Sequence, residues 1–216
     1  MPDSTLLPEL IALSASRSPD SPALTYGGNT LSYAELDRLQ RQFRNGLLAL
    51  GLERGERVAV YLEKRFETVV TSFGATAAGG VFVPLNPLLK PDQVAYILRD
   101  CNVRVLVTSP ERLALLAPVL PACHDLRQVV VTEGKTDLSA PHPIAFEGWT
   151  DVLASPEAPG HRVIDTDMAA ILYTSGSTGK PKGVVLSHRN MVAGAKSVAS
   201  YLDNRPADTL LAALPL

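Results

Sequence analysis

The sequence predicts an α/β fold in which a mostly parallel sheet is flanked by helices. Short apolar segments rich in β-branched residues alternate with helical patterns, and this rhythm is typical of a parallel sheet covered by helices. The chain has 216 residues, of which 46% are hydrophobic and 19% charged, so it is long enough to bury a sizeable core. The expected strands cover residues 57–62, 81–87, 103–109 and 127–132, and the expected helices cover 66–80, 91–100 and 111–120.

The first residues favour an amphipathic helix and not a signal peptide. Leu6, Leu7, Leu10 and Ile11 recur at helical spacing, and Glu9 interrupts them. No basic stretch precedes these apolar residues, as a secretory signal would require.

Residues 23–33 predict a short β-hairpin, because Gly-Gly-Asn at 27–29 favours a tight turn. Ser32 and Glu35 then fit a capping box at the start of a helix that runs to about residue 50. Gly51 fits the position that follows a helix end.

The stretch 133–163 is rich in proline and poor in periodic apolar residues, and it predicts a surface connection with one helical turn near Trp149. A strand is expected at 168–173 and a second one at 183–187. Ser187 is placed to cap a helix over 189–202. The final residues, 209–216, predict a buried strand with nothing after it, which indicates a truncated chain.

Composition excludes several classes of function. The formal net charge is −2, so no basic excess points to nucleic acid or to a membrane surface. No apolar run approaches the roughly 20 residues that a membrane-spanning helix needs. Cys101 and Cys123 lack the spacing of a metal or disulfide motif, so we expect buried, reduced thiols, no metal site and a cytoplasmic location.

Residues 171–188, ILYTSGSTGKPKGVVLSH, place a loop rich in glycine and hydroxyl groups between two expected strands. Such a loop lets successive backbone N–H groups point inward and bind an anion, and hydroxyl groups add donors. Acidic residues are absent between Asp167 and Asp203, so a polyphosphate would meet little repulsion. The cations in this interval are Lys180, Lys182, Arg189 and Lys196.

Two familiar phosphate motifs do not fit this loop. The P-loop needs glycine where Thr174 stands and a hydroxyl residue where Pro181 stands, and it joins a strand to a helix. The dinucleotide fingerprint G-x-G-x-x-G is absent. From the residues alone, a flexible solvent-exposed hairpin loop remains an equal alternative to a phosphate site.

The stretch YTSGSTGKPKGVVLSH resembles the phosphate-loop signature of the AMP-forming adenylating enzymes, which include acyl-CoA synthetases, peptide-synthetase adenylation domains and luciferases. Residues 30–39, 51–70 and 74–100 are similar to the amino-terminal blocks of that family. Asn86 in VPLNP resembles acyl-CoA synthetases, because peptide-synthetase domains more often carry aspartate there. The whole chain is most similar to the acyl-CoA ligases found with exosortase systems.

The resemblance implies a two-step reaction that uses ATP, Mg²⁺ and coenzyme A. A carboxylate attacks the α-phosphorus of ATP to give an acyl-adenylate and pyrophosphate, and a thiol then displaces AMP. The acid itself is not identified by the sequence. We expect the loop, which carries the implied site, to be poorly ordered without nucleotide, and we expect Tyr173 and His188 to be structural. The residues that match the family's loop for the β- and γ-phosphates are Thr174, Ser175, Gly176, Ser177, Thr178, Gly179 and Lys180, with Lys182 as a further matching position.

The resemblance also implies that residues 1–216 are the incomplete amino-terminal part of a large adenylate-forming domain. The catalytic residues and the mobile carboxyl-terminal lid domain are then expected beyond Leu216, so this part alone is expected to be inactive. A start at Met1 shortly before the first helix favours a free-standing ligase. The alternatives are a peptide-synthetase-type adenylation domain that loads a carrier protein and a non-catalytic folded fragment.

Overall fold

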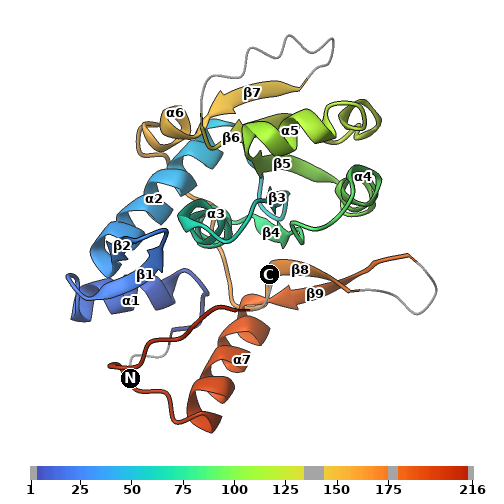
Figure 1. Ribbon diagram of the computed structural model, residues 1–216. Helices are drawn as coiled ribbons and strands as arrows, with labels where there is room; N and C mark the ends of the chain where they lie inside the picture. The colour runs from blue at the N-terminus through green and yellow to red at the C-terminus, as the bar shows by residue number, and fades with distance from the viewer. Residues whose placement is uncertain (1–3, 134–143, 175–179, 214–216) are drawn as a thin grey trace.

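The computed structural model describes residues 4–133, 144–174 and 180–213. Within these residues, a seven-stranded sheet has helices on both faces, and a separate two-stranded hairpin lies near the amino terminus (Figure 1). The strands are β1 Pro22–Tyr26, β2 Asn29–Ser32, β3 Arg57–Tyr61, β4 Val81–Pro84, β5 Val103–Thr108, β6 Gln128–Val131, β7 Ala145–Gly148, β8 Met168–Thr174 and β9 Lys182–Ser187. The helices are α1 Glu9–Arg17, α2 Tyr33–Ala49, α3 Phe66–Ala77, α4 Pro91–Asp100, α5 Pro110–Leu116, α6 Trp149–Leu153 and α7 His188–Tyr201, with a 3₁₀ turn at Leu120–Ala122.

The sheet has the strand order β7-β6-β5-β3-β4-β8-β9. Each neighbouring pair from β7 to β8 is parallel, and β9 is antiparallel to β8. The predicted α/β class with a mostly parallel sheet is therefore confirmed. Several elements are shorter than expected. For example, β4 ends at Pro84.

Alternation along β3 divides the core into two layers. Val58 and Val60 belong to a buried cluster with residues of α1, α2, α3 and α6, whereas Ala59 and Tyr61 belong to a cluster with residues of α4 and α5. Successive side chains of a strand point to opposite faces of a sheet. A strand buried on both sides must be apolar at every position, which is why residues 57–62 show no polar alternation.

Local signals near the amino terminus form as predicted. The β1–β2 turn places Gly27 and Gly28 at φ 58° and 81°, which suits the two-residue turn of a twisted hairpin. The Glu35 N–H donates to Ser32 Oγ at 3.2 Å, and the Ser32 N–H donates to Glu35 Oε2 at 2.7 Å, which completes the capping box of α2. Gly51 follows α2 at φ 79°.

Glycines allow close packing around α2. A Cβ atom at Gly74 would lie 2.8 Å from Phe43 Cδ1, so α3 approaches α2 closely at this point. The Phe43 ring stacks on Trp149 of α6, with 4.8 Å between the ring centroids. Because these contacts involve α2, α3 and α6, one buried layer holds together segments that are about 100 residues apart in the chain.

The interpretation of 133–163 as only a surface connection is wrong. The helical turn near Trp149 is present as α6, but Ala145–Gly148 forms β7 and pairs in parallel with β6. The segment Ala-Phe-Glu-Gly has no β-branched residue, and its strand lies at the edge of the sheet, where burial on both faces is not required. Its strand conformation therefore leaves little trace in the hydrophobic pattern.

The predicted buried strand at 209–216 is also wrong within the described residues. Residues 209–213 have no regular secondary structure, and Leu210 and Leu211 are 71% and 90% exposed. A strand needs a neighbour with which its backbone groups pair, and the described sheet ends at β9.

Two further expectations concern the cysteines and membrane-spanning helices. Cys101 and Cys123 are both buried and free, as expected. Among the described helices, none combines the length and the hydropathy that a membrane crossing needs.

We expect Gly46→Ala to destabilise the chain although alanine favours helices. A Cβ atom there would lie 2.4 Å from the Val152 backbone oxygen, and overpacking of this kind costs about 1–3 kcal/mol. Gly194→Ala in α7 is the matched control, because nothing lies within 4 Å of its added Cβ. We expect the control to gain about 0.5–1 kcal/mol. Urea unfolding of both variants measures the difference, and an equal gain in both would contradict the prediction.

Candidate functional site

The β8–β9 hairpin presents the candidate site at the carboxyl-terminal edge of the parallel sheet (Figure 1). β8 runs parallel to β4 and ends at Thr174. In open α/β sheets, ligands bind outside the carboxyl ends of the strands. Thr174 and Lys180, the described residues that border the loop, are therefore on the edge where a ligand is expected.

Three of the predicted site residues lie in the described part of the chain. Thr174 ends β8 and Lys182 begins β9, and the two residues pair directly across the antiparallel ladder. Lys180 is exposed, and its ammonium nitrogen lies 5.9 Å from the centroid of the Tyr96 ring. The prediction that the loop is poorly ordered concerns mainly residues outside the described part. The remaining predicted site residues, Ser175, Gly176, Ser177, Thr178 and Gly179, also lie outside it.

Sequence reasoning missed a polar contact between the hairpin and α4. The hydroxyl of Tyr173, the residue before Thr174, donates to Asp100 Oδ2 at 2.6 Å. Burial, followed by the hydrogen bond to the Asp100 carboxylate, raises the pKa of Tyr173. Tyr173 therefore stays protonated and donating at physiological pH, and a polar tie adds to the packing role expected for this side chain.

The Tyr173 ring also packs against the second strand. A Cβ atom at Gly183 would lie 3.2 Å from Tyr173 Cζ and 2.8 Å from Ile171 Cγ2. Glycine at this position allows the ring to cover the β9 backbone, because a larger residue would displace it. The apparently flexible glycine is thus a packing requirement of the hairpin.

The cations counted in the sequence do not all lie at the loop. Arg189, in the first turn of α7, forms an ion pair with Asp165, with Nε–Oδ2 and Nη2–Oδ1 distances of 2.8 and 3.1 Å. Because β9 runs away from the loop, its following helix begins at the amino-terminal end of β8. Lys180 and Lys182 are therefore the described cations that flank the loop, whereas Arg189 is held at the opposite edge.

His188 lies at the same distant edge, where it is fully buried. The Leu7 N–H donates to His188 Nδ1 at 3.1 Å, so this ring nitrogen is unprotonated. The Nε2 atom is buried without a hydrogen-bond partner among the described residues. His188 thus anchors the amino-terminal segment, in agreement with a structural role.

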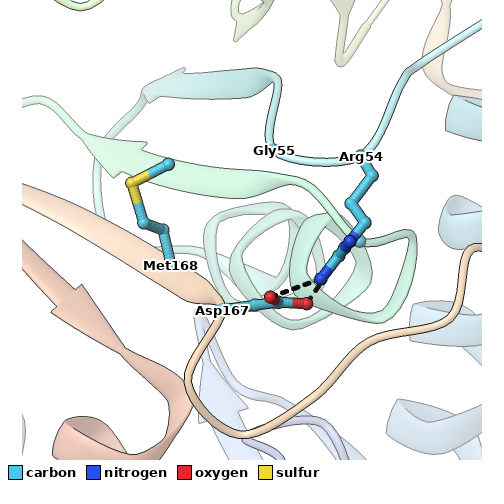
Figure 2. Close-up of a pocket in the computed structure, with 5 residues that line it drawn as sticks. Arg54, Gly55, Asp167 and Met168 are labelled. Carbon is cyan, nitrogen blue, oxygen red and sulfur yellow. Dashed lines mark hydrogen bonds and ion pairs between the residues drawn. The ribbon is translucent and has the colours of Figure 1, made fainter.

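A cavity of about 300 Å³ lies where β3, β4 and β8 begin, and its lining includes Gly55, Gly79 and Met168 (Figure 2). Figure 2 shows Arg54 reaching Asp167, with an Nη2–Oδ1 distance of 2.6 Å. The hydrogen bond from Arg54 lowers the pKa of Asp167. This cavity lies at the amino-terminal edge of the sheet, and its charged groups are paired with each other. A structural role therefore suits the cavity, and the β8–β9 hairpin is the better candidate for a ligand site.

The described residues contain no group of three or more histidine, cysteine, aspartate or glutamate side chains able to hold a metal ion. What the described part of the loop site offers is a hydroxyl group and two ammonium groups, which suit phosphate oxygens.

We expect the stability of the chain to fall as the pH drops below about 6.5, because of His188. Burial lowers its pKa below the ordinary value of 6.5, although Asp167, Glu9 and Asp165 oppose this shift. The unfolded chain therefore takes up a proton at a pH at which the folded chain resists it. The stabilisation is complete above pH 6.5 and is lost progressively toward the folded pKa.

Urea unfolding at pH 7.5 and 5.5 measures this dependence. His188→Gln should flatten it, whereas His124→Gln, which changes an exposed histidine, should preserve it. An identical pH dependence in the parent chain and in His188→Gln would contradict the prediction.

The sequence profile of the AMP-binding enzyme family matches residues 11–216. The feruloyl-CoA synthase of an Amycolatopsis species is 33% identical over 202 residues, which cover 94% of this chain and 37% of that protein. Surfactin synthase subunit 3 of Bacillus subtilis is 33% identical over 194 residues, which cover 90% of this chain and 14% of that protein.

A solved long-chain-fatty-acid-CoA ligase from Archaeoglobus fulgidus shares the fold, with a TM-score of 0.86 at 23% identity. The match covers 100% of this chain and 43% of that structure. The chain thus spans less than half the length of these relatives. Because the family profile covers almost every residue, the chain belongs to the AMP-binding enzyme family of adenylate-forming enzymes.

Proposed function

We propose that the chain supplies the phosphate-loop part of an ATP-dependent, AMP-forming acyl-CoA ligase. The observation that carries the proposal is the pairing of Thr174 with Lys182 at the carboxyl edge of the sheet, beside Lys180, in a chain of this family. In the proposed reaction, a carboxylate forms a bond to the α-phosphorus of ATP and pyrophosphate leaves. The sulfur of coenzyme A then attacks the acyl carbon and AMP leaves.

The loop acts by positioning and by charge. In this proposal, the hydroxyl of Thr174 and the ammonium groups of Lys180 and Lys182 contact the β- and γ-phosphate oxygens. Negative charge grows on the departing pyrophosphate, so donors and cations held in advance stabilise the transition state. Mg²⁺ bound to the phosphates would supply further positive charge, and the described residues would hold it through the phosphate oxygens.

Asn86 favours coenzyme A as the acceptor. Its side-chain oxygen accepts from the Leu88 N–H at 2.9 Å, which shapes the turn after β4. The sequence resembles acyl-CoA synthetases at this residue, although peptide synthetases are comparably similar overall. A carrier-protein acceptor is therefore the second candidate, and thioester assays with coenzyme A and with a phosphopantetheinyl carrier protein separate the two.

The proposal places the remaining catalytic parts outside this sequence. The matched region is 37% of the feruloyl-CoA synthase relative, so an enzyme of that length has further regions that can carry the catalytic residues. One loop offers too few contacts to offset the cost of ordering a nucleotide. The buried free thiols Cys101 and Cys123 fit a reducing compartment, and we propose the cytoplasm.

In the intact ligase, we expect Lys180→Ala and Thr174→Ala to slow adenylate formation by about tenfold or more, because each removes a group that contacts the leaving pyrophosphate. Thioester formation from a preformed acyl-adenylate should change much less, since pyrophosphate has already left. Acid-dependent pyrophosphate–ATP exchange measures the first step. Lys196→Ala, which removes the same charge from α7, serves as the control. Unchanged exchange in both loop variants would refute the role of the loop.

The 216-residue chain by itself should form no acyl-CoA. A coupled assay for AMP release, run with a panel of carboxylic acids and coenzyme A, tests this expectation. Release of AMP that requires both the acid and coenzyme A would show that residues 1–216 are sufficient for catalysis. Folding of the sample is checked in parallel by a cooperative urea transition.

A further inference from the structure

We propose that Asp100 and Tyr96 of α4 are positioning residues that fix both stems of the phosphate loop. This inference rests on the proposed function, because it assigns to α4 the task of holding Thr174 and Lys180 where phosphates bind. Neither residue is among the site residues that the sequence predicts. They act through the hairpin and not by contact with the substrate.

The first stem is held by Tyr173. Its hydroxyl donates to Asp100 Oδ2 at 2.6 Å, and the next residue is Thr174. A hydrogen bond to a charged acceptor is stronger than one between neutral groups, although exposure to water weakens it. Since adjacent backbone positions move together, this bond fixes the point at which the strand leaves the sheet and becomes the loop.

The second stem is held by Tyr96. Its hydroxyl lies 3.5 Å from the Pro181 backbone oxygen and 3.4 Å from Asp100 Oδ1, and its ring lies under the Lys180 ammonium group. A phenol has a single proton, so the hydroxyl donates to one of these oxygens at a time. Tyr96 therefore makes weaker contacts than Tyr173 does, but they converge on the residues that follow the loop.

Helix stability does not explain Asp100. It is the last residue of α4, where a negative charge interacts unfavourably with the helix dipole. The two tyrosine hydroxyl groups offer a reason for a carboxylate at this position, because it can accept from Tyr173 of the first stem and from Tyr96 of its own helix. Asp100 thus contacts the first stem directly, and Tyr96 beside it contacts the second stem.

The arrangement also keeps Lys180 available to a nucleotide. An exposed cation–π contact is weak, so the ammonium group is restrained but easily released to a phosphate oxygen. The benefit is preorganisation, since a lysine held near its working position loses less freedom when ATP binds.

The test uses Tyr173→Phe, Asp100→Ala and Asp100→Asn in the intact ligase. We expect kcat/KM for MgATP in pyrophosphate–ATP exchange to fall about tenfold in the first two variants. Asp100→Asn keeps one acceptor oxygen and should recover part of the loss. The KM for the acid and the rate of thioester formation from preformed acyl-adenylate should stay within about twofold of the parent.

Tyr26→Phe and Asp92→Ala are the matched controls. Tyr26 is a tyrosine of the β1–β2 hairpin, and Asp92 is an aspartate at the opposite end of α4. The two changes remove a tyrosine hydroxyl and an aspartate carboxylate, as the test variants do, but at positions away from the β8–β9 hairpin. We expect them to leave kcat/KM for MgATP unchanged, even if Asp92→Ala lowers the Tm through loss of a favourable charge in the first helical turn.

Three outcomes are distinguishable. If Tyr173→Phe and Asp100→Ala slow both half-reactions equally and lower the Tm, the contacts are only a structural brace and the inference is overturned. If they leave the exchange unchanged while Lys180→Ala slows it, the positioning role is overturned and the proposed function stands. If Lys180→Ala also leaves the exchange unchanged, the proposed function fails and the inference fails with it.

Discussion

The placement of the candidate site depends on the parallel pairing of β8 with β4. The chain leaves the opposite edge of the sheet after β7 and returns to pair Ala170 with Phe82. Ala169 and Ala170 are fully buried there, and their small side chains allow close approach to the neighbouring layers. This one pairing directs the end of β8, and with it Thr174, to the carboxyl-terminal edge of the sheet, where ligands of open α/β sheets bind.

Signals that act over a few residues are predictable from the sequence, whereas those that depend on a distant neighbour are not. The capping box of Ser32 depends on only four consecutive residues, and it forms as expected. β7 has no comparable local pattern, because pairing with β6 decides its conformation. Residues 209–213 show the opposite case, in which an apolar sequence forms no strand.

The site illustrates the same distinction through charge. Arg189 is near Lys182 in the sequence, but the antiparallel turn of the hairpin carries it to the other edge of the sheet and into an ion pair with Asp165. Asp100 lies 73 residues before Tyr173 and still meets its hydroxyl. The sequence therefore predicts the kind of loop, and only the fold reveals which side chains surround it.

The exposed setting of Lys180 and Lys182 explains why a loop of this kind needs covering elements to catalyse a reaction. Two unit charges 4 Å apart attract by about 1 kcal/mol in water, and several times more strongly where the effective dielectric constant is near 20. In the proposed reaction, the same ammonium groups would therefore stabilise a departing pyrophosphate weakly at an open edge and strongly once water is excluded. Fixing the stems supplies the geometry in advance, and closure of the site by other elements supplies the strength.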